Sequence, residues 1–172
     1  VVFYKQTILG PLWHIIQPLV NSGIFTIIFS KVAEIPTDGA PPFLFYMAGT
    51  VTWGYFAACL TLTSSTFVSN SDIFGKVFFP RMTVPIAIVI TGFFQFIIQF
   101  VIFLVFLLYY WSQGAQVEPT IMVFALPLIL LQMAFLVLGM GILISSLVTK
   151  YRDLLFAMSF AVQIWMYITP VV

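Results

Sequence analysis

The sequence predicts an all-α protein, a bundle of helices that cross a membrane. Its 172 residues are 62% hydrophobic and only 6% charged, with a mean hydropathy of +1.16. Soluble domains carry about 25% charged residues. Crossing the ~30 Å hydrocarbon core of a bilayer takes about 20 apolar residues in a helix. Five stretches contain no charged residue, and each suffices for one crossing: 6–30, 39–71, 82–117, 119–149 and 154–172.

The apolar runs favour helices over the strands of a membrane β-barrel. Barrel strands are about 10 residues long and alternate apolar with polar side chains. Residues 97–108 and 124–131 are instead apolar on every side, as a helix surrounded by lipid is. No polar linker is long enough to separate two domains, so residues 1–172 are expected to form a single transmembrane domain.

The expected crossings can be placed from the charges and from proline and glycine. Pro11 begins the first crossing, where its missing N–H would have no partner in any case. The loop KVAEIPTDGAPP is a solvent turn after the first crossing, and TKYRD is a tight polar turn before the last. The predicted crossings are residues 11–30, 43–68, 83–110, 121–148 and 154 to the end.

The basic residues predict which side of the membrane each loop occupies. Inside loops are enriched in Lys and Arg, whereas acidic residues carry little weight. With a cytoplasmic N-terminus, only Lys31 lies outside. The basic residues that then lie inside are Lys5, Lys76, Arg81, Lys150 and Arg152.

Several classes of activity are disfavoured by residues that the sequence lacks. It has no glycine-rich phosphate-binding loop, so the chain itself is not expected to bind or hydrolyse ATP. No ionisable Asp, Glu, Lys or Arg falls inside a predicted crossing, which disfavours a carrier driven by protons or sodium ions. With one His and one Cys, Cys59, no catalytic set, metal site or disulfide framework is expected. Nothing points to a nucleic-acid partner.

Uncharged polar residues recur at helical spacing in the first and last crossings. They would either bond between helices, as buried amides and hydroxyls do in membranes, or line a path for a polar substrate. Aromatic residues near the ends of the crossings, Tyr167 among them, are either interfacial anchors or surfaces for the C–H groups of sugars. The candidate path residues are His14, Gln17, Asn21, Ser159, Gln163 and Tyr167.

A second pattern of small residues lies on one face of the second crossing. Its members are spaced at three and four residues, which would let a neighbouring helix approach closely. This face is therefore expected to pack against another helix. It comprises Thr50, Gly54, Ala57, Thr61, Ser64 and Val68.

The inside loop between the second and third crossings combines large apolar and basic side chains. Such a segment either lies on lipid headgroups or docks into the groove of a cytoplasmic partner, and composition alone does not separate these alternatives. The residues concerned are Asp72, Ile73, Phe74, Lys76, Val77, Phe78, Phe79, Pro80 and Arg81.

Three segments resemble one family. YKQTILGPLWHIIQPL is similar to the entry of the first crossing in type-2 ABC permeases that export polysaccharides and polyol phosphates, the O-antigen and teichoic-acid exporters. SNSDIFGKVFFPRMTVP resembles the first cytoplasmic loop of that family, and KYRDLLFAMSFAVQIWMYITPVV its RD turn and the following crossing. The resemblance covers essentially the whole chain. His14 stands where the family often has an aromatic or aliphatic residue.

The resemblance implies a homodimer in the bacterial inner membrane, each copy bound through the loop around Asp72–Arg81 to an ABC ATPase subunit that holds ATP and Mg. It also implies six crossings, an N-terminal interfacial helix and short re-entrant helices before the last crossing. By this comparison the chain is a fragment that lacks the start of the interfacial helix, the re-entrant helices and the last crossing. The cargo would be a lipid-linked glycan or polyol phosphate.

Two other functions stay open at this point. One is a type-2 ABC permease for drugs or small lipids. The other is a membrane-bound glycan-assembly factor without transport activity, which would need ionisable residues near the interface. The outer loops offer only Lys31, Glu34, Asp38 and Glu118.

The orientation can be tested by labelling single cysteines. Cysteines at Asp38 and Glu118 are expected to react with an impermeant reagent on intact cells, because the basic residues place both positions outside. Cysteines at Lys76 and Arg152 should react only after lysis. Labelling of the Lys76 position from outside would invert the topology.

Overall fold

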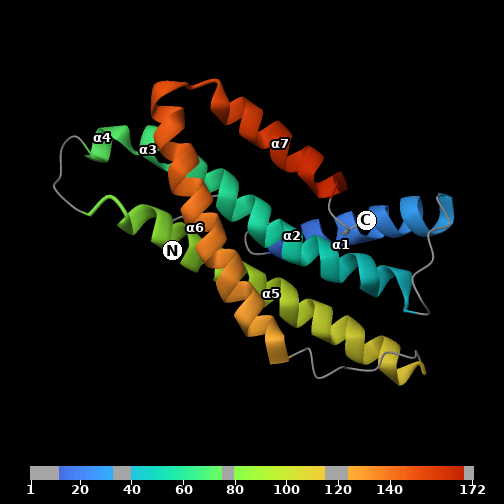
Figure 1. Ribbon diagram of the computed structural model, residues 1–172. Coiled ribbons are helices and arrows are strands. Elements are labelled where there is room, and N and C mark those ends of the chain that lie inside the picture. The colour runs from blue at the N-terminus through green and yellow to red at the C-terminus, as the bar shows by residue number, and fades with distance from the viewer. Residues whose placement is uncertain (1–11, 33–39, 75–79, 115–123, 169–172) are drawn as a thin grey trace. The chain divides into compact units, whose positions relative to one another are not determined.

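The computed structural model describes residues 12–32, 40–74, 80–114 and 124–168, and the regular elements in these ranges are all helices (Figure 1). The predicted all-α class is therefore confirmed. In chain order the elements are α1 (Trp13–Phe25), the π-helix η3 (Thr26–Val32), α2 (Pro42–Ser64), α3 (Thr66–Ser69), α4 (Ser71–Phe74), α5 (Thr83–Ser112), α6 (Leu126–Lys150) and α7 (Leu154–Ile168).

The helix lengths bear on the number of crossings. Three described helices are long and apolar enough to span a bilayer: α2, α5 and α6, with 23, 30 and 25 residues. They coincide with the second, third and fourth predicted crossings. The first and fifth coincide with the shorter apolar helices Ile15–Ser30 and Leu154–Ile168. The described part of α7 has 15 residues and rises about 22 Å.

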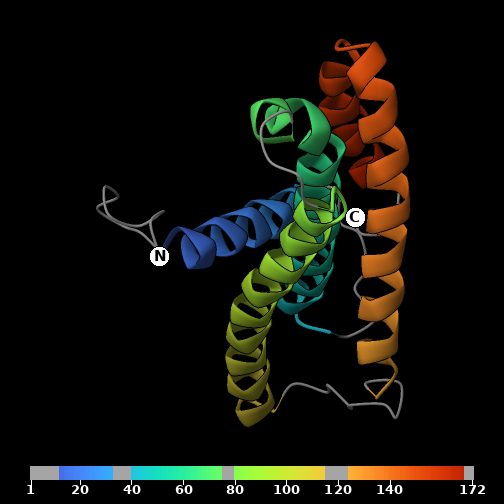
Figure 2. The same cartoon turned by 90° about the vertical axis from the view of Figure 1, so that its left-hand side faces the viewer.

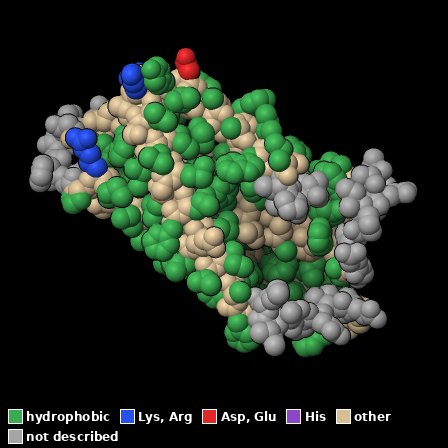
Figure 3. Space-filling model, viewed as in Figure 1, with side chains coloured by type: hydrophobic (Ala, Val, Ile, Leu, Met, Phe, Trp, Pro, Cys, Tyr) green, Lys and Arg blue, Asp and Glu red, His purple; other side chains and the backbone are tan. Residues whose placement is uncertain are grey.

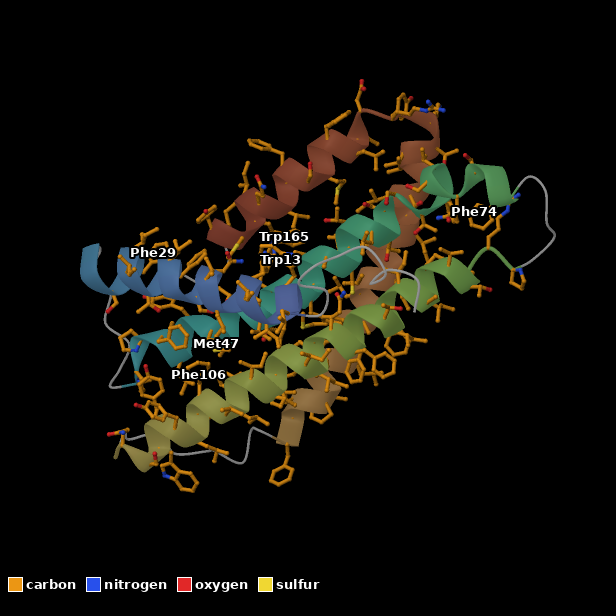
Figure 4. The ribbon with its side chains drawn as sticks, turned by 180° about the vertical axis from the view of Figure 1, so that it is seen from behind. Trp13, Phe29, Met47, Phe74, Phe106 and Trp165 are labelled. Carbon is orange, nitrogen blue, oxygen red and sulfur yellow. The ribbon has the colours of Figure 1, made fainter. Side chains whose placement is uncertain are left out.

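The described helices belong to two compact units, and both α2 and α5 are divided between them. The first unit contains α1, η3, the part of α2 up to Thr52 and the part of α5 from Gln95 onward. A buried hydroxyl pair joins α1 to α2, with Ser22 Oγ 3.0 Å from Thr50 Oγ1, and either group can be the donor. The rings of Phe29 and Tyr46 lie 5.9 Å apart. Those of Phe43 and Phe106, on α2 and α5, lie 5.2 Å apart. Phe29, Phe106 and the fully buried Met47 are labelled in Figure 4. This unit therefore combines aromatic packing with a buried polar contact between α1 and α2.

The second unit contains α2 from Trp53, α3, α4, α5 as far as Phe94, α6 and α7. The short helix α3 lies beside the C-terminal end of α6, and α4 packs on α3 (Figures 1 and 2). A buried stripe on α6 follows the spacing of one helix face, which is why this side packs while most of the helix is exposed to its surroundings. The stripe is Leu130, Val137, Gly141, Ser145 and Val148.

Close approach of helices in the second unit depends on two glycines. A Cβ on Gly92 of α5 would collide with the Cys59 side chain of α2. A Cβ on Gly141 of α6 would lie 2.5 Å from Thr63 Cγ2 and 2.7 Å from Thr63 Cβ. Small residues commonly permit such contacts between membrane helices. The packed face of α2 thus includes Cys59 and Thr63.

This arrangement corrects the expectation for the small-residue face of α2. The prediction is confirmed at Thr50 and Ser64, which are buried. It is not met within the described part of the chain at Gly54, where no described atom lies within 4 Å of the Cβ position, or at Thr61, which is exposed. The sequence pattern identified small side chains but not the direction from which the neighbouring helices approach.

The glycine contact on α6 generates a stability prediction. Gly141→Ala should lower the stability of the folded protein by about 1–3 kcal/mol, because the new methyl group overlaps the Cβ of Thr63, which cannot move without its backbone. Gly139→Ala is the matched control. No atom lies within 4 Å of its Cβ position, and alanine favours the helix by up to about 1 kcal/mol. Thermal unfolding in the same detergent compares the two, and equal melting temperatures would show that α2 and α6 do not touch here.

Candidate functional site

The end of the second unit that holds α3 and α4 contains all the charged side chains that the structure describes. These are Arg81, Lys150, Arg152 and Asp153, and each is exposed. Figure 3 shows Lys and Arg side chains at one end of an otherwise mainly apolar face. Within the described part of the chain, the gathering of basic groups at one end matches the asymmetry of a cytoplasmic surface. A net positive charge is thus presented beside the short helices.

The predicted docking segment begins within these short helices. Phe74, labelled in Figure 4, closes α4, and its ring lies 6.0 Å from that of Phe67 on α3 at 72°. The backbone of Asp72 and Ile73 is helical, while their side chains lie outside the described part. Lys76, Val77, Phe78 and Phe79 lie outside the described residues altogether. Pro80 and Arg81 follow, and both are exposed. The segment therefore has an aromatic contact near its start, at Phe74, and an exposed cation at its end, Arg81.

The turn between α6 and α7 lies in the same unit and is as tight as predicted. α6 ends at Lys150 and α7 begins at Leu154. The Tyr151 N–H donates to Leu147 O at 2.9 Å, and the N–H groups of Phe156 and Ala157 both donate to Asp153 O. The Lys150 ammonium lies 5.3 Å from the centre of the Tyr151 ring. Backbone bonds on both sides of the turn therefore fix the direction in which α7 leaves α6.

The candidate path residues of α1 lie on an exposed face. Gln17 and Asn21 are exposed, whereas Pro18 and Ser22, one position further along, are buried. The side chain of His14 lies outside the described part. The buried polar contact of this helix is thus made by Ser22, a residue that the sequence pattern did not select.

The candidate path residues of α7 are exposed as well. Ser159 and Gln163 are exposed although Val162 beside them is buried, and Tyr167 is 67% exposed. Phe156 and Phe160 share their side of the helix, at 80% and 65% exposure. Spacings of four, three and four residues align Phe156, Phe160, Gln163 and Tyr167 along one line of the helix. We call these four residues the α7 stripe.

An exposed hydroxyl and an exposed amide are not equally strong indicators of polar surroundings. The exposed hydroxyls of Thr91, Ser146 and Ser159 donate to carbonyls three or four residues earlier, at 2.8, 2.6 and 2.9 Å. Such groups satisfy themselves within their own helix and can face lipid. A primary amide has two donor hydrogens and an acceptor oxygen, more than one carbonyl of the same turn can satisfy. The amides of Gln17, Asn21 and Gln163 are therefore the stronger indicators of a polar environment, and Ser159 is a weaker one.

One tryptophan that the sequence suggested as an interfacial anchor makes a packing contact. Trp165 of α7 lies 6.4 Å from the ring of Trp53 and 5.7 Å from that of Phe56, both on α2, in edge-to-face geometry. The signal in the sequence is its spacing from Val162, which is buried. The side of α7 that carries Trp165 therefore packs on α2, and the α7 stripe lies on a different side of the helix.

Among the described residues, no three His, Cys, Asp or Glu side chains come together as they would around a metal ion. The arrangement offers charged and apolar groups for a partner at one end and polar faces along two helices.

Comparison with known proteins decides the family. The sequence matches the ABC-2 type transporter family over residues 1–172. This chain belongs to that family. Membership agrees with the resemblance seen in the first crossing, the inside loop and the RD turn. It also accounts for a multi-pass membrane protein with a basic, partly apolar segment at one end.

Two members of the family are similar to this chain over almost its whole length. The O-antigen export system permease protein RfbA of Klebsiella pneumoniae is 29% identical over 171 residues, which is 99% of this chain and 63% of the relative. The protein of the same name from Myxococcus xanthus is 24% identical over 168 residues, 98% of this chain and 62% of the relative. The chain thus spans a little under two thirds of the length of these relatives.

The exposed amides generate a prediction about the path. If these amides line a transport path, Gln17→Leu, Asn21→Leu and Gln163→Leu should lower export, because a wet conduit replaces water contacts of a polar cargo with its own donors and acceptors. On the same hypothesis, Asn21→Trp should narrow the conduit. The measurement is export per folded permease, with yield scored independently.

Matched controls come from exposed apolar neighbours. Val20→Leu and Ile164→Leu alter side chains that are 52% and 43% exposed and should be nearly silent, since lipid accepts any apolar shape. Ile16→Leu is a further conservative change and should also leave export nearly unchanged. Export that falls only in proportion to yield would identify the amides as helix-packing groups.

Proposed function

We propose that this chain is the membrane-spanning part of an ABC exporter permease that moves a lipid-linked polysaccharide or polyol phosphate out of the cytoplasm. The observation that carries the proposal is the match to a transporter family along the whole chain, together with relatives named as O-antigen export permeases. The chain acts as a permease and catalyses no reaction. A separate ATPase subunit binds ATP and Mg and supplies the energy.

The α7 stripe supports a glycan rather than a purely apolar cargo. Phenyl and phenol rings offer flat apolar faces to the C–H side of a sugar ring, and an amide between them can exchange hydrogen bonds with sugar hydroxyls. Three aromatic residues alone would suit lipid equally well. Gln163 in the middle of the stripe distinguishes the two, because an amide facing hydrocarbon is costly.

The exposed amides also support the presence of a second copy. Gln17 and Asn21 on α1 and Gln163 on α7 lie on faces that the described helices do not cover. In a bilayer such faces need a protein or aqueous neighbour. A homodimer in the inner membrane, with cytoplasmic N-termini, supplies that neighbour and encloses a conduit.

The segment Asp72–Arg81 is the proposed dock for the ATPase subunit. Its support is the fixed start at Phe74, the exposed Arg81 and the further exposed cations Lys150 and Arg152 in the same unit. Apolar side chains inserted into a groove and ringed by cations fit a helix-in-groove mode of recognition.

The experiment introduces charges into this dock. Phe78→Asp, Phe79→Asp and Arg81→Glu should abolish export and release the ATPase subunit, because each leaves an unpaired charge or a like-charge contact in the interface, typically costing several kcal/mol. The permease should still insert and accumulate, since the segment lies outside the bilayer. Co-purification of the ATPase subunit and polysaccharide at the cell surface are the two measurements.

Lys31→Glu, on the opposite side of the membrane, is the control and should bind the ATPase subunit normally. Normal co-purification from the dock variants would show that the segment only rests on lipid. A permease that binds and stimulates an ATPase but leaves surface glycans unchanged when deleted would favour the alternative cargo, a drug or small lipid. A chain that binds no ATPase would favour a glycan-assembly factor.

A further inference from the structure

Helix α2 is interrupted by its own hydroxyl groups just before the docking segment. Ser64 Oγ donates to Thr61 O at 2.8 Å, Ser65 Oγ to Leu62 O at 3.0 Å and Thr66 Oγ1 to Leu62 O at 3.1 Å. Hydroxyls that bond back to the preceding turn compete with the backbone and bend helices. Accordingly α2 ends at Ser64 and α3 begins at Thr66.

The hydroxyl that would be expected to cap α3, that of Ser65, is directed toward the preceding turn. Ser65 is the N-cap residue of α3, but it makes no side-chain cap bond. Its hydroxyl is turned back to Leu62 O. The first amides of a helix have no partner within the helix and are usually capped by such a side chain. An early amide of α3 therefore needs a partner from outside.

That partner comes from α6. The Phe67 N–H donates to Ser145 Oγ at 3.1 Å, a bond between residues 78 positions apart in the chain. Ser145 is 1% exposed, so the bond is shielded from its surroundings. A serine of one helix thus caps another helix.

A second contact lies one turn earlier on α6. Gly141 approaches Thr63 so closely that a Cβ would overlap it. Thr63 precedes the interruption in the helix and Phe67 follows it. The Gly141 and Ser145 positions of α6 therefore hold both sides of the α2–α3 junction.

The capped junction connects two parts of the molecule that have separate roles in the proposed function. Toward the dock, Phe67 packs on Phe74, which immediately precedes residues 75–79. Toward α7, Thr149 Oγ1 donates to Ser145 O at 3.0 Å, and α6 ends one residue later, at the turn into α7. A displacement of α3 is therefore applied to α6 next to the origin of α7.

We propose that Ser145 is a positioning residue that couples the docking segment to α6 and α7, by capping α3 across the helix boundary. The proposal rests on the proposed function, in which an ATPase subunit moves the docking segment. Without the cap, the dock would still bind its partner, but its movement would be absorbed at the α2–α3 junction, which would no longer be bonded to α6 at Phe67.

The test compares Ser145→Ala with Ser146→Ala in the full-length permease bound to its ATPase subunit. Ser146 is the matched control because it is the next residue, is exposed and bonds only within its own helix, to Leu143 O. Ser145→Ala should raise amide exchange in residues 66–70 roughly fivefold, as expected for a lost helix cap. Polysaccharide exported per assembled complex should fall by a similar factor, with ATPase binding intact. Ser146→Ala should change neither quantity.

Ser145→Thr distinguishes the hydroxyl from a simple packing effect. It retains the acceptor, and should exchange more slowly and export more than Ser145→Ala. Unchanged exchange in Ser145→Ala would overturn the cap. Raised exchange with unchanged export per complex would overturn the coupling, as would a Ser145→Thr variant that exchanges like wild type but exports like Ser145→Ala. Absence of any bound ATPase in the wild type would instead refute the proposed function, while the exchange comparison still decides the cap.

Discussion

The exclusion of water from the bilayer interior is the constraint on which the rest of this structure depends. Backbone and side-chain polar groups must find partners within the protein, since lipid tails offer none. Hydroxyls in the described part of the chain bond to carbonyls of their own helix, as at Thr91, Ser146 and Ser159. Exposed amides cannot be fully satisfied in this way, and those of Gln17, Asn21, Gln132 and Gln163 indicate faces that need a neighbour other than lipid.

The fold class could be predicted from the sequence because composition alone determines it. Charge-free stretches of sufficient length have one stable form in a membrane, and the breaks between them fall at charges, prolines and glycines. The boundaries of α5 and of the α6–α7 turn follow directly from this rule. The π-helix at Thr26–Val32 and the break of α2 at Ser64 do not, because they depend on individual hydrogen bonds that hydropathy does not register.

The sequence could predict that small residues would lie at helix contacts, but not which of them would do so. Small residues on α2 were correctly expected to meet other helices, but Gly54 is exposed and Thr63 is the residue that meets Gly141. Almost every face of these helices is apolar, so the usual contrast between a buried and a solvated face is missing. For the candidate site, the sequence could identify the chemical groups, the amides and the basic apolar segment. It could not identify Ser145, whose role depends on a partner 78 residues away.

The three-residue turn between α6 and α7 has a consequence for how the protein enters the membrane. α6 is long and strongly apolar, and α7 follows it after only Tyr151, Arg152 and Asp153. A turn this short keeps the two helices together during synthesis, which favours their insertion as a hairpin. In the proposed orientation, Lys150 and Arg152 lie on the cytoplasmic side of the bilayer, where basic residues resist transfer across it. The same few residues would thus determine both the direction of α7 and the side of the membrane from which it starts.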